Sequence, residues 1–116
     1  MKTSAELRPR LRIVVAGGQV FGPGKAELLG HIAVTGSIRA SAARMKMSYA
    51  RAWNLVRQAN RLFASPLVAA VRGGASGGGA VLTARGRRVL RLYARMVRTS
   101  ERATRRDWAA LRRLLR

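Results

Sequence analysis

The stretch TGSIRASAARMKMSYARAWNLVRQANRLFA, residues 35–64, decides the fold. Ser37 and Ser48 each stand just before a helix-forming run, where a serine hydroxyl can accept a hydrogen bond from a free amide of the first turn. Lys46-Met47 lies between the two runs and forms a tight turn. A short capped helix, a turn and a longer capped helix predict a helix-turn-helix over residues 37–63.

The longer helix has two chemically different sides. With about 100° per residue, its apolar positions fall on one narrow stripe that must be buried: Ala52, Val56, Ala59 and Phe63. The opposite side is polar and cationic, as in helices that enter the DNA major groove. We expect base readout from Tyr49, Arg51 and Asn54, since Arg pairs with guanine and Asn with adenine. Trp53 fits two roles: packing beside the core or contact with DNA.

A second group of residues suits the DNA backbone, because most protein–DNA hydrogen bonds reach phosphates and only fix the register. The alternative for every member is a solvated surface or, for the serines, a purely structural cap. The expected backbone contacts are Ser37, Arg39, Arg44, Lys46, Ser48 and Arg57.

Outward from this stretch the chain reads as one domain over residues 1–116. The expected elements are N-terminal strand or strands at 7–22, three helices within 25–64, a β-hairpin at 67–83, and a long basic helix at 84–116 that could support dimerisation. The predicted fold class is mainly α with a small β-sheet: a winged helix-turn-helix with a β-hairpin wing and a long C-terminal helix.

The segment RGGASGGGAVLT, residues 72–83, is interpreted as the wing. It lacks the Gly-Lys-Ser/Thr ending of a phosphate-binding loop and does not fit the dinucleotide-binding pattern. Its glycines would let the backbone approach DNA closely. The expected wing residues are Arg72, Gly73, Gly74, Ser76, Gly77, Gly78 and Gly79.

The composition favours a polyanionic partner. The chain has 24 Lys and Arg against 4 Asp and Glu, a formal net charge of +20, so double-stranded DNA is the expected partner. With one His and no Cys, the sequence offers no nucleophile–base pair and no metal cluster. We therefore expect no enzyme, no catalytic residue, no metal and no cofactor. No apolar run is long enough for a membrane span, which predicts a cytoplasmic, nucleoid-associated protein.

The residues Met47-Ser48-Tyr49, Ala52-Trp53, Asn60, Gly73-Gly74 and Leu82-Thr83 together resemble the N-terminal DNA-binding domain of the molybdate-responsive ModE regulators, whose helix-turn-helix is similar to that of LysR-type regulators. The resemblance implies a homodimer that binds a palindromic operator.

Two departures from this family are visible. Ser76 stands where the family usually has a lysine, which puts that phosphate contact in doubt. No oxyanion-binding domain follows before Arg116, so we expect a stand-alone form that does not sense molybdate itself, with a separate protein as an effector-sensing partner.

The sequence is also compatible with two other functions. The main alternative is a nonspecific architectural, nucleoid-associated protein whose affinity comes from terminal arginines such as Arg105-Arg106 and Arg112-Arg113. A module that binds anionic membranes through residues 87–116 ranks last, because it would leave the recognition-helix pattern unexplained.

Overall fold

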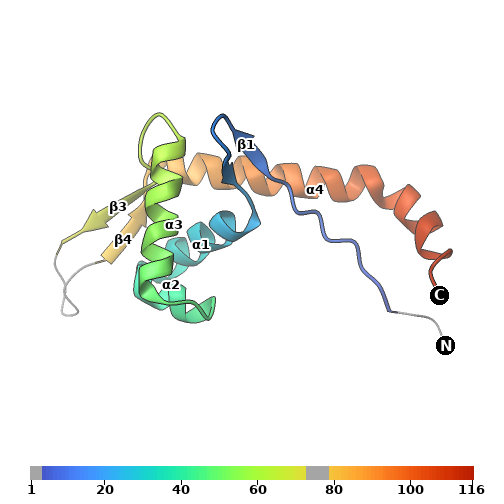
Figure 1. The fold of residues 1–116 in the computed structure, drawn as a ribbon, viewed down its shortest axis with the longest axis horizontal. Helices are drawn as coiled ribbons and strands as arrows, with labels where there is room; N and C mark the ends of the chain where they lie inside the picture. The colour runs from blue at the N-terminus through green and yellow to red at the C-terminus, as the bar shows by residue number, and fades with distance from the viewer. Residues whose placement is uncertain (1–3, 73–78) are drawn as a thin grey trace.

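The computed structural model describes residues 4–72 and 79–116. Its helices cluster around one end of a long C-terminal helix, whose other end extends away from the cluster, and a hairpin projects on the opposite side (Figure 1). In chain order the elements are β1 (Ile13–Val15), β2 (Gln19–Phe21), α1 (Pro23–Thr35), α2 (Ile38–Arg44), α3 (Tyr49–Leu62), β3 (Val68–Val71), β4 (Gly79–Leu82) and α4 (Ala84–Arg112).

The strands form two separate antiparallel pairs, β1–β2 and β3–β4. In the first pair Ile13 lies opposite Phe21, and in the second Val68 lies opposite Leu82. At the end of β2 the ring of Phe21 packs on the rings of Phe63 and Tyr93, from the helical part of the chain. The prediction of a small β-sheet is corrected: the described residues form two small two-stranded sheets.

The predicted winged helix-turn-helix class is also wrong for the residues that the structure describes. They show a short two-stranded ladder over β3 and β4 and no clear wing beyond it. The expectation rested on the glycine-rich loop, and residues 73–78 of that loop lie outside the described part of the chain. What remains is a helical cluster with two small hairpins.

Three predicted helix starts are confirmed by side-chain caps. The Ser37 hydroxyl accepts a hydrogen bond from the Ala40 amide at 3.0 Å, and the Ser48 hydroxyl accepts one from the Arg51 amide at 3.1 Å. The Thr83 hydroxyl does the same for the amide of Gly86. Each cap satisfies an amide that has no partner inside its helix, so the start of α2, α3 and α4 is fixed locally.

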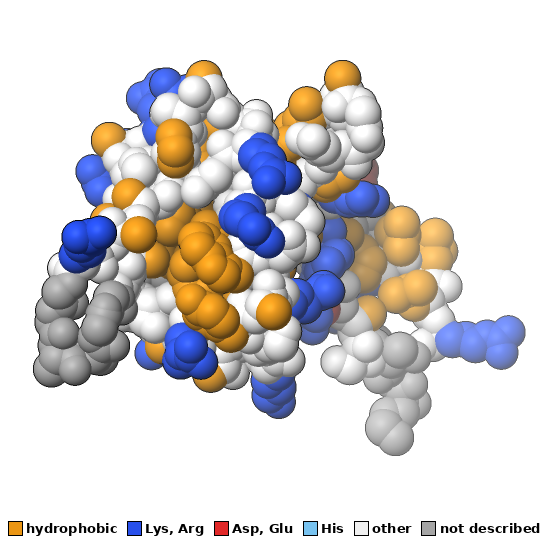
Figure 2. Space-filling model, turned by 60° about the vertical axis from the view of Figure 1, so that its left-hand side comes forward, with side chains coloured by type: hydrophobic (Ala, Val, Ile, Leu, Met, Phe, Trp, Pro, Cys, Tyr) orange, Lys and Arg blue, Asp and Glu red, His pale blue; other side chains and the backbone are white. Residues whose placement is uncertain are grey.

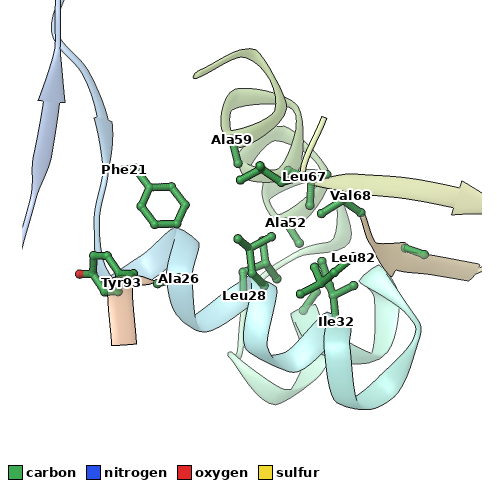
Figure 3. Close-up of a cluster of buried hydrophobic side chains, with 14 residues drawn as sticks. Phe21, Ala26, Leu28, Ile32, Ala52, Ala59, Leu67, Val68, Leu82 and Tyr93 are labelled. Atoms are coloured by element: carbon green, nitrogen blue, oxygen red, sulfur yellow. The ribbon is translucent and has the colours of Figure 1, made fainter. Parts of the chain in front are cut away.

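The core lies between α1, α3 and the hairpin β3–β4 (Figure 3). The expected stripe of α3 is buried at Ala52, Val56 and Ala59, and Phe63 is half-buried beside it. Phe21 is fully buried and meets the rings of Phe63 and Tyr93 edge-on, with centroid distances of 5.6 and 5.5 Å. This aromatic cluster joins β2 to the end of α3 and to α4.

Leu67 is the point where α3, β3 and α4 meet. Asn60 of α3 accepts hydrogen bonds from the amides of Leu67 and Val68 and donates one to the Val68 carbonyl. The Leu67 carbonyl also accepts a bond from the Thr83 amide at 2.9 Å. At Gly86 a Cβ would overlap the carbonyl oxygen of Leu67, so only glycine lets α4 pass this close. These contacts fix the orientation of α3 relative to the hairpin.

The long helix α4 is anchored only along its first half. The Tyr93 hydroxyl donates a hydrogen bond of 2.7 Å to the Leu11 carbonyl, which holds the N-terminal segment against α4. Beyond Ser100 the side chains are exposed, except the half-buried Trp108. None of the helices in the described part of the chain combines the length and the apolar character needed to span a membrane.

Candidate nucleic-acid interface

The outer face of α3 is exposed and carries the expected base-reading residues. Tyr49, Arg51 and Asn54 are all exposed in the first turns of the helix: Asn54 lies opposite the buried stripe, and Arg51 and Tyr49 lie on its two flanks. Arg57 follows one turn after Trp53 and is also exposed. The sequence pattern thus correctly predicted which side of α3 faces solvent, while the contacts of these residues with DNA stay predictions.

Cations from α2 and the following turn surround this face. Arg39, Arg44 and Lys46 are exposed, and the Arg39 guanidinium lies over the Tyr49 ring, 4.4 Å from its centroid. Within residues 4–72 and 79–116 the ion pairs are Arg8 with Glu6 and His31 with Glu27, and neither touches this face. The charge on this surface is therefore not neutralised from within the described chain.

The turn between α2 and α3 has an unusual backbone. Lys46 adopts a φ of 56°, and among the described residues it is the non-glycine residue with positive φ. Three amides in succession, those of Met45, Lys46 and Met47, donate to carbonyls of α2. The left-handed conformation thus closes α2 and directs the chain into α3.

The two serines among the predicted DNA-backbone contacts, Ser37 and Ser48, have a structural role. Ser37 is half-buried and Ser48 is exposed, and both hydroxyl oxygens already accept amides of their own helices. Their role as caps is confirmed. A contact with phosphate would have to use the remaining hydroxyl hydrogen, so it stays a prediction.

A groove of about 750 Å³ lies between α3 and the hairpin β3–β4. Trp53 lines it, with Tyr49 nearby and with Val71 and Val81 from the two strands. Hydrophobic side chains gather on this face of the molecule, and Lys and Arg side chains surround them (Figure 2). Trp53 is thus an exposed part of the groove wall and not a buried core residue, and its contact with DNA stays a prediction.

The predicted wing residues divide into three groups. Arg72 is exposed at the end of β3 and available to a ligand. Gly79 has a packing role instead: a Cβ there would lie 2.8 Å from the carbonyl oxygen of Gly36. The others lie outside the described residues: Gly73, Gly74, Ser76, Gly77 and Gly78.

Sequence reasoning missed the residues that orient this surface. Asn60 and Gly86 had no assigned role, yet they join α3, β3 and α4 around Leu67. A signal was present, since an isolated asparagine beside the buried stripe of an amphipathic helix is a candidate for a satisfied internal hydrogen bond. Its partners could not be predicted, because they belong to another element.

The shifted ionisable groups lie away from this face. Burial lowers the pKa of Lys25, whose ammonium donates to the Val20 carbonyl at 2.8 Å. Burial raises the pKa of Tyr93, and the charge of Arg10 opposes part of that shift. In the described part of the chain no group of three His, Cys, Asp or Glu side chains could hold a metal.

The fold and the surface together define a small, strongly cationic helical protein that presents one capped helix, basic and aromatic, to solvent.

No protein-family model matches the sequence. Related proteins do: the chain is 43% identical over 76 residues to the molybdenum-pterin-binding protein MopB of Rhodobacter capsulatus, covering 66% of this chain and 28% of MopB. It is 40% identical over 81 residues to the transcriptional dual regulator ModE of Escherichia coli, covering 70% of this chain and 31% of ModE. The molybdenum transport protein ModE of Azotobacter vinelandii is 34% identical over 91 residues, covering 78% of this chain and 34% of that protein.

These similarities place the chain beside part of a molybdenum-related group of proteins that includes transcriptional regulators. The chain spans about a third of the length of these relatives.

The narrower identification, a stand-alone ModE DNA-binding domain without molybdate-binding domains, is wrong. The matched stretch is shared with MopB and MopA, which are named for binding molybdenum-pterin, so the match points to molybdenum-related proteins and does not single out a DNA-binding domain. The expectation that the chain does not sense molybdate is not supported either, because that expectation rested on where the sequence ends.

Proposed function

We propose that this protein is a sequence-specific DNA-binding transcriptional regulator whose helix α3 enters the major groove. The observation that carries the proposal is the outer face of α3, where Arg51, Asn54 and Arg57 are exposed on a helix anchored by its buried opposite stripe. Relatives of the chain that are named transcriptional regulators support it.

The chemistry of this face suits a duplex. Arg51 in the first turn can donate two bonds to a guanine, and Asn54 can pair with the edge of an adenine, each contributing about 1–3 kcal/mol of discrimination. Arg39, Arg44 and Lys46 are exposed on α2 and the turn before α3, and they suit phosphates, which set the register without reading sequence. Residues 73–78 are not part of this proposed interface.

A regulator of this kind would act as a homodimer on a palindromic site in the cytoplasm, since two-fold protein symmetry is matched by two half-sites. The proposal includes no catalytic step and no cofactor. Sequence-blind compaction of DNA is the rival activity, because a net charge of +20 alone provides affinity for any duplex.

Selection of bound duplexes from a random library at physiological salt tests the proposal. We expect a consensus to emerge, and we expect Arg51→Ala to relax that consensus at one position. An Arg105→Ala variant, altered on the exposed far half of α4, should retain the consensus. Recovery of duplexes without any shared sequence would contradict specific regulation and favour the architectural role.

MopB and MopA are named molybdenum-pterin-binding proteins, and from this we propose a second candidate function, the binding of a molybdenum-containing anion. A hollow of about 420 Å³ between β2, α1 and α3 is lined by Lys25, Gln58 and Arg61, donors that suit an anion. Titration calorimetry with molybdate, using Arg61→Gln as the variant and sulfate as the competing anion, measures this directly. Absence of heat with molybdate would remove the second candidate and leave the first untouched.

A further inference from the structure

The groove beside α3 is more apolar than a phosphate-binding surface requires. Trp53 and Tyr49 expose 41% and 40% of their surfaces, and Val71 and Val81 on the facing strands expose 42% and 47%. Exposed apolar groups gathered in one place usually mark a contact surface. Nothing in the folded core accounts for their exposure, because the buried stripe of α3 is already complete at Ala52, Val56 and Ala59.

The apolar groups lie on one flank of the surface that would face DNA. With about 100° per residue, Trp53 lies about 60° to one side of Ala50 and Asn54 about 40° to the other. Ala50 is exposed and small, so it lets the helix approach a ligand closely. The helix thus offers an apolar group and a hydrogen-bonding group side by side, with Trp53 on the side of the hairpin.

The charges around the groove identify its occupant as a polyanion with apolar groups. The guanidinium of Arg39 lines the groove and lies over the Tyr49 ring, and the exposed Arg57 follows Trp53 by one turn of α3. In a duplex the phosphates lie on both sides of the major groove, and the one apolar group in that groove is the C5-methyl of thymine. A duplex therefore matches both the cationic surroundings and the apolar centre.

We propose that Trp53, with Ala50 and Tyr49, contacts thymine C5-methyl groups and selects thymine at those positions. The inference rests on the proposed function, and it adds what the outer face of α3 recognises. Arg and Asn would read hydrogen-bonding edges on one flank, while Trp53 would read shape and hydrophobicity on the other.

Replacement of thymine by deoxyuridine tests the inference, because it removes only the methyl group. Fluorescence anisotropy at fixed salt would compare a selected duplex with the same duplex containing deoxyuridine at each thymine in turn. We expect about a three- to fourfold loss of affinity for each methyl that the protein contacts. Placing 5-methylcytosine at a contacted position should restore part of the loss that unmodified cytosine causes there.

Variants connect the effect to Trp53. Trp53→Ala should lose the difference between thymine and deoxyuridine at the position that Trp53 contacts, and Trp53→Phe should keep part of that difference. Val14→Ala is the matched control, since Val14 is an exposed apolar residue on β1 and does not line the groove. It should show the full thymine preference.

The outcomes separate the two proposals. Equal wild-type affinity for thymine and deoxyuridine duplexes would overturn the thymine contact and leave DNA binding intact. A thymine preference that survives in Trp53→Ala at every position where the wild type shows one would overturn the assignment to Trp53. Unchanged overall affinity in that variant would point to a protein partner for the groove. Failure to bind any duplex would overturn the proposed function itself. If Trp53→Ala does not fold, the thymine preferences of the wild type and of Trp53→Phe test the assignment to Trp53.

Discussion

Gly86 lies in the first turn of α4 where the helix passes the carbonyl of Leu67. Gly86→Ala should destabilise the protein by at least about 2 kcal/mol, because the new Cβ overlaps backbone that is already hydrogen-bonded. Gly30→Ala is the control within a helix: a Cβ there meets nothing within 4 Å, so the change should stabilise by up to about 1 kcal/mol. Urea unfolding of both variants measures the difference, and equal destabilisation would contradict the packing role of Gly86.

Lys46 combines a surface charge with a strained backbone at φ 56°. Lys46→Gly should raise stability by up to about 1 kcal/mol, because glycine tolerates the left-handed region, whereas Lys46→Ala should leave stability nearly unchanged. Both variants should weaken binding to every duplex and reduce the salt slope by about one, if Lys46 contacts a phosphate. Thermal unfolding and salt titrations check the two effects. A salt slope equal to that of the wild type in both variants would exclude the phosphate contact.

Single residues differ in how well the sequence predicted them. Ser37, Ser48 and Thr83 could be assigned as caps because a cap and its partner amide are three residues apart. Asn60 and Gly86 could not be assigned, because their partner Leu67 lies on a different element and the distance along the chain carries no signal. A contact between residues that are close together in the chain can be predicted from the sequence, whereas a close approach between separate elements cannot.

The position of α3 relative to the hairpin β3–β4 depends on the Asn60 side chain. Asn60→Ala removes three hydrogen bonds and leaves half-buried backbone groups of Leu67 and Val68 without partners, which should cost about 2–3 kcal/mol. Asn60→Asp keeps an acceptor for both amides and should cost less. Denaturant unfolding gives both values.

Hydrogen exchange distinguishes a local role of Asn60 from an effect on global stability. The amides of Leu67 and Val68 should exchange faster in Asn60→Ala than in the wild type, while those of α2 should not change. Uniform acceleration across the whole chain would show that Asn60 acts on global stability and not on this junction.

Among the elements, the helices were more predictable than the sheets. The stripe of α3 follows from a 3.6-residue period within one segment, so its burial could be expected from the sequence. The position of β1–β2 could not be expected, because Phe21 packs against Phe63 and Tyr93, which are far away in the chain. The same limit explains the groove: neither α3 nor the hairpin alone indicates that Trp53 would line a hollow with Val71 and Val81.

Across the whole molecule, the Tyr93 hydroxyl ties the N-terminal segment to α4 through the Leu11 carbonyl. Tyr93→Phe should cost about 1 kcal/mol at neutral pH, because it removes one hydrogen bond and keeps the ring packing. The raised pKa of Tyr93 makes this contribution pH-dependent: it is complete below the ordinary tyrosine pKa and is lost as the pH rises through the higher value of the folded state.

The stability difference between wild type and Tyr93→Phe should therefore be constant below about pH 10 and shrink as the pH rises above it. Lys25, whose lowered pKa has the opposite effect on stability over this range, is present in both proteins and cancels in the comparison. Unfolding curves at several pH values give the difference. A constant difference across the range would show that the hydroxyl does not titrate as inferred.

The one-sided anchoring of α4 has a mechanical consequence. The helix is 29 residues long, and its core contacts lie in the first half, so the remainder behaves as a lever with its fulcrum near Tyr93. At 1.5 Å per residue, a rotation of about 10° there moves Arg112 by roughly 5 Å. Because α3 is joined to the first turn of α4 through Leu67, a change in the orientation of α3 that tilts α4 would displace the far end of α4 much more than its start.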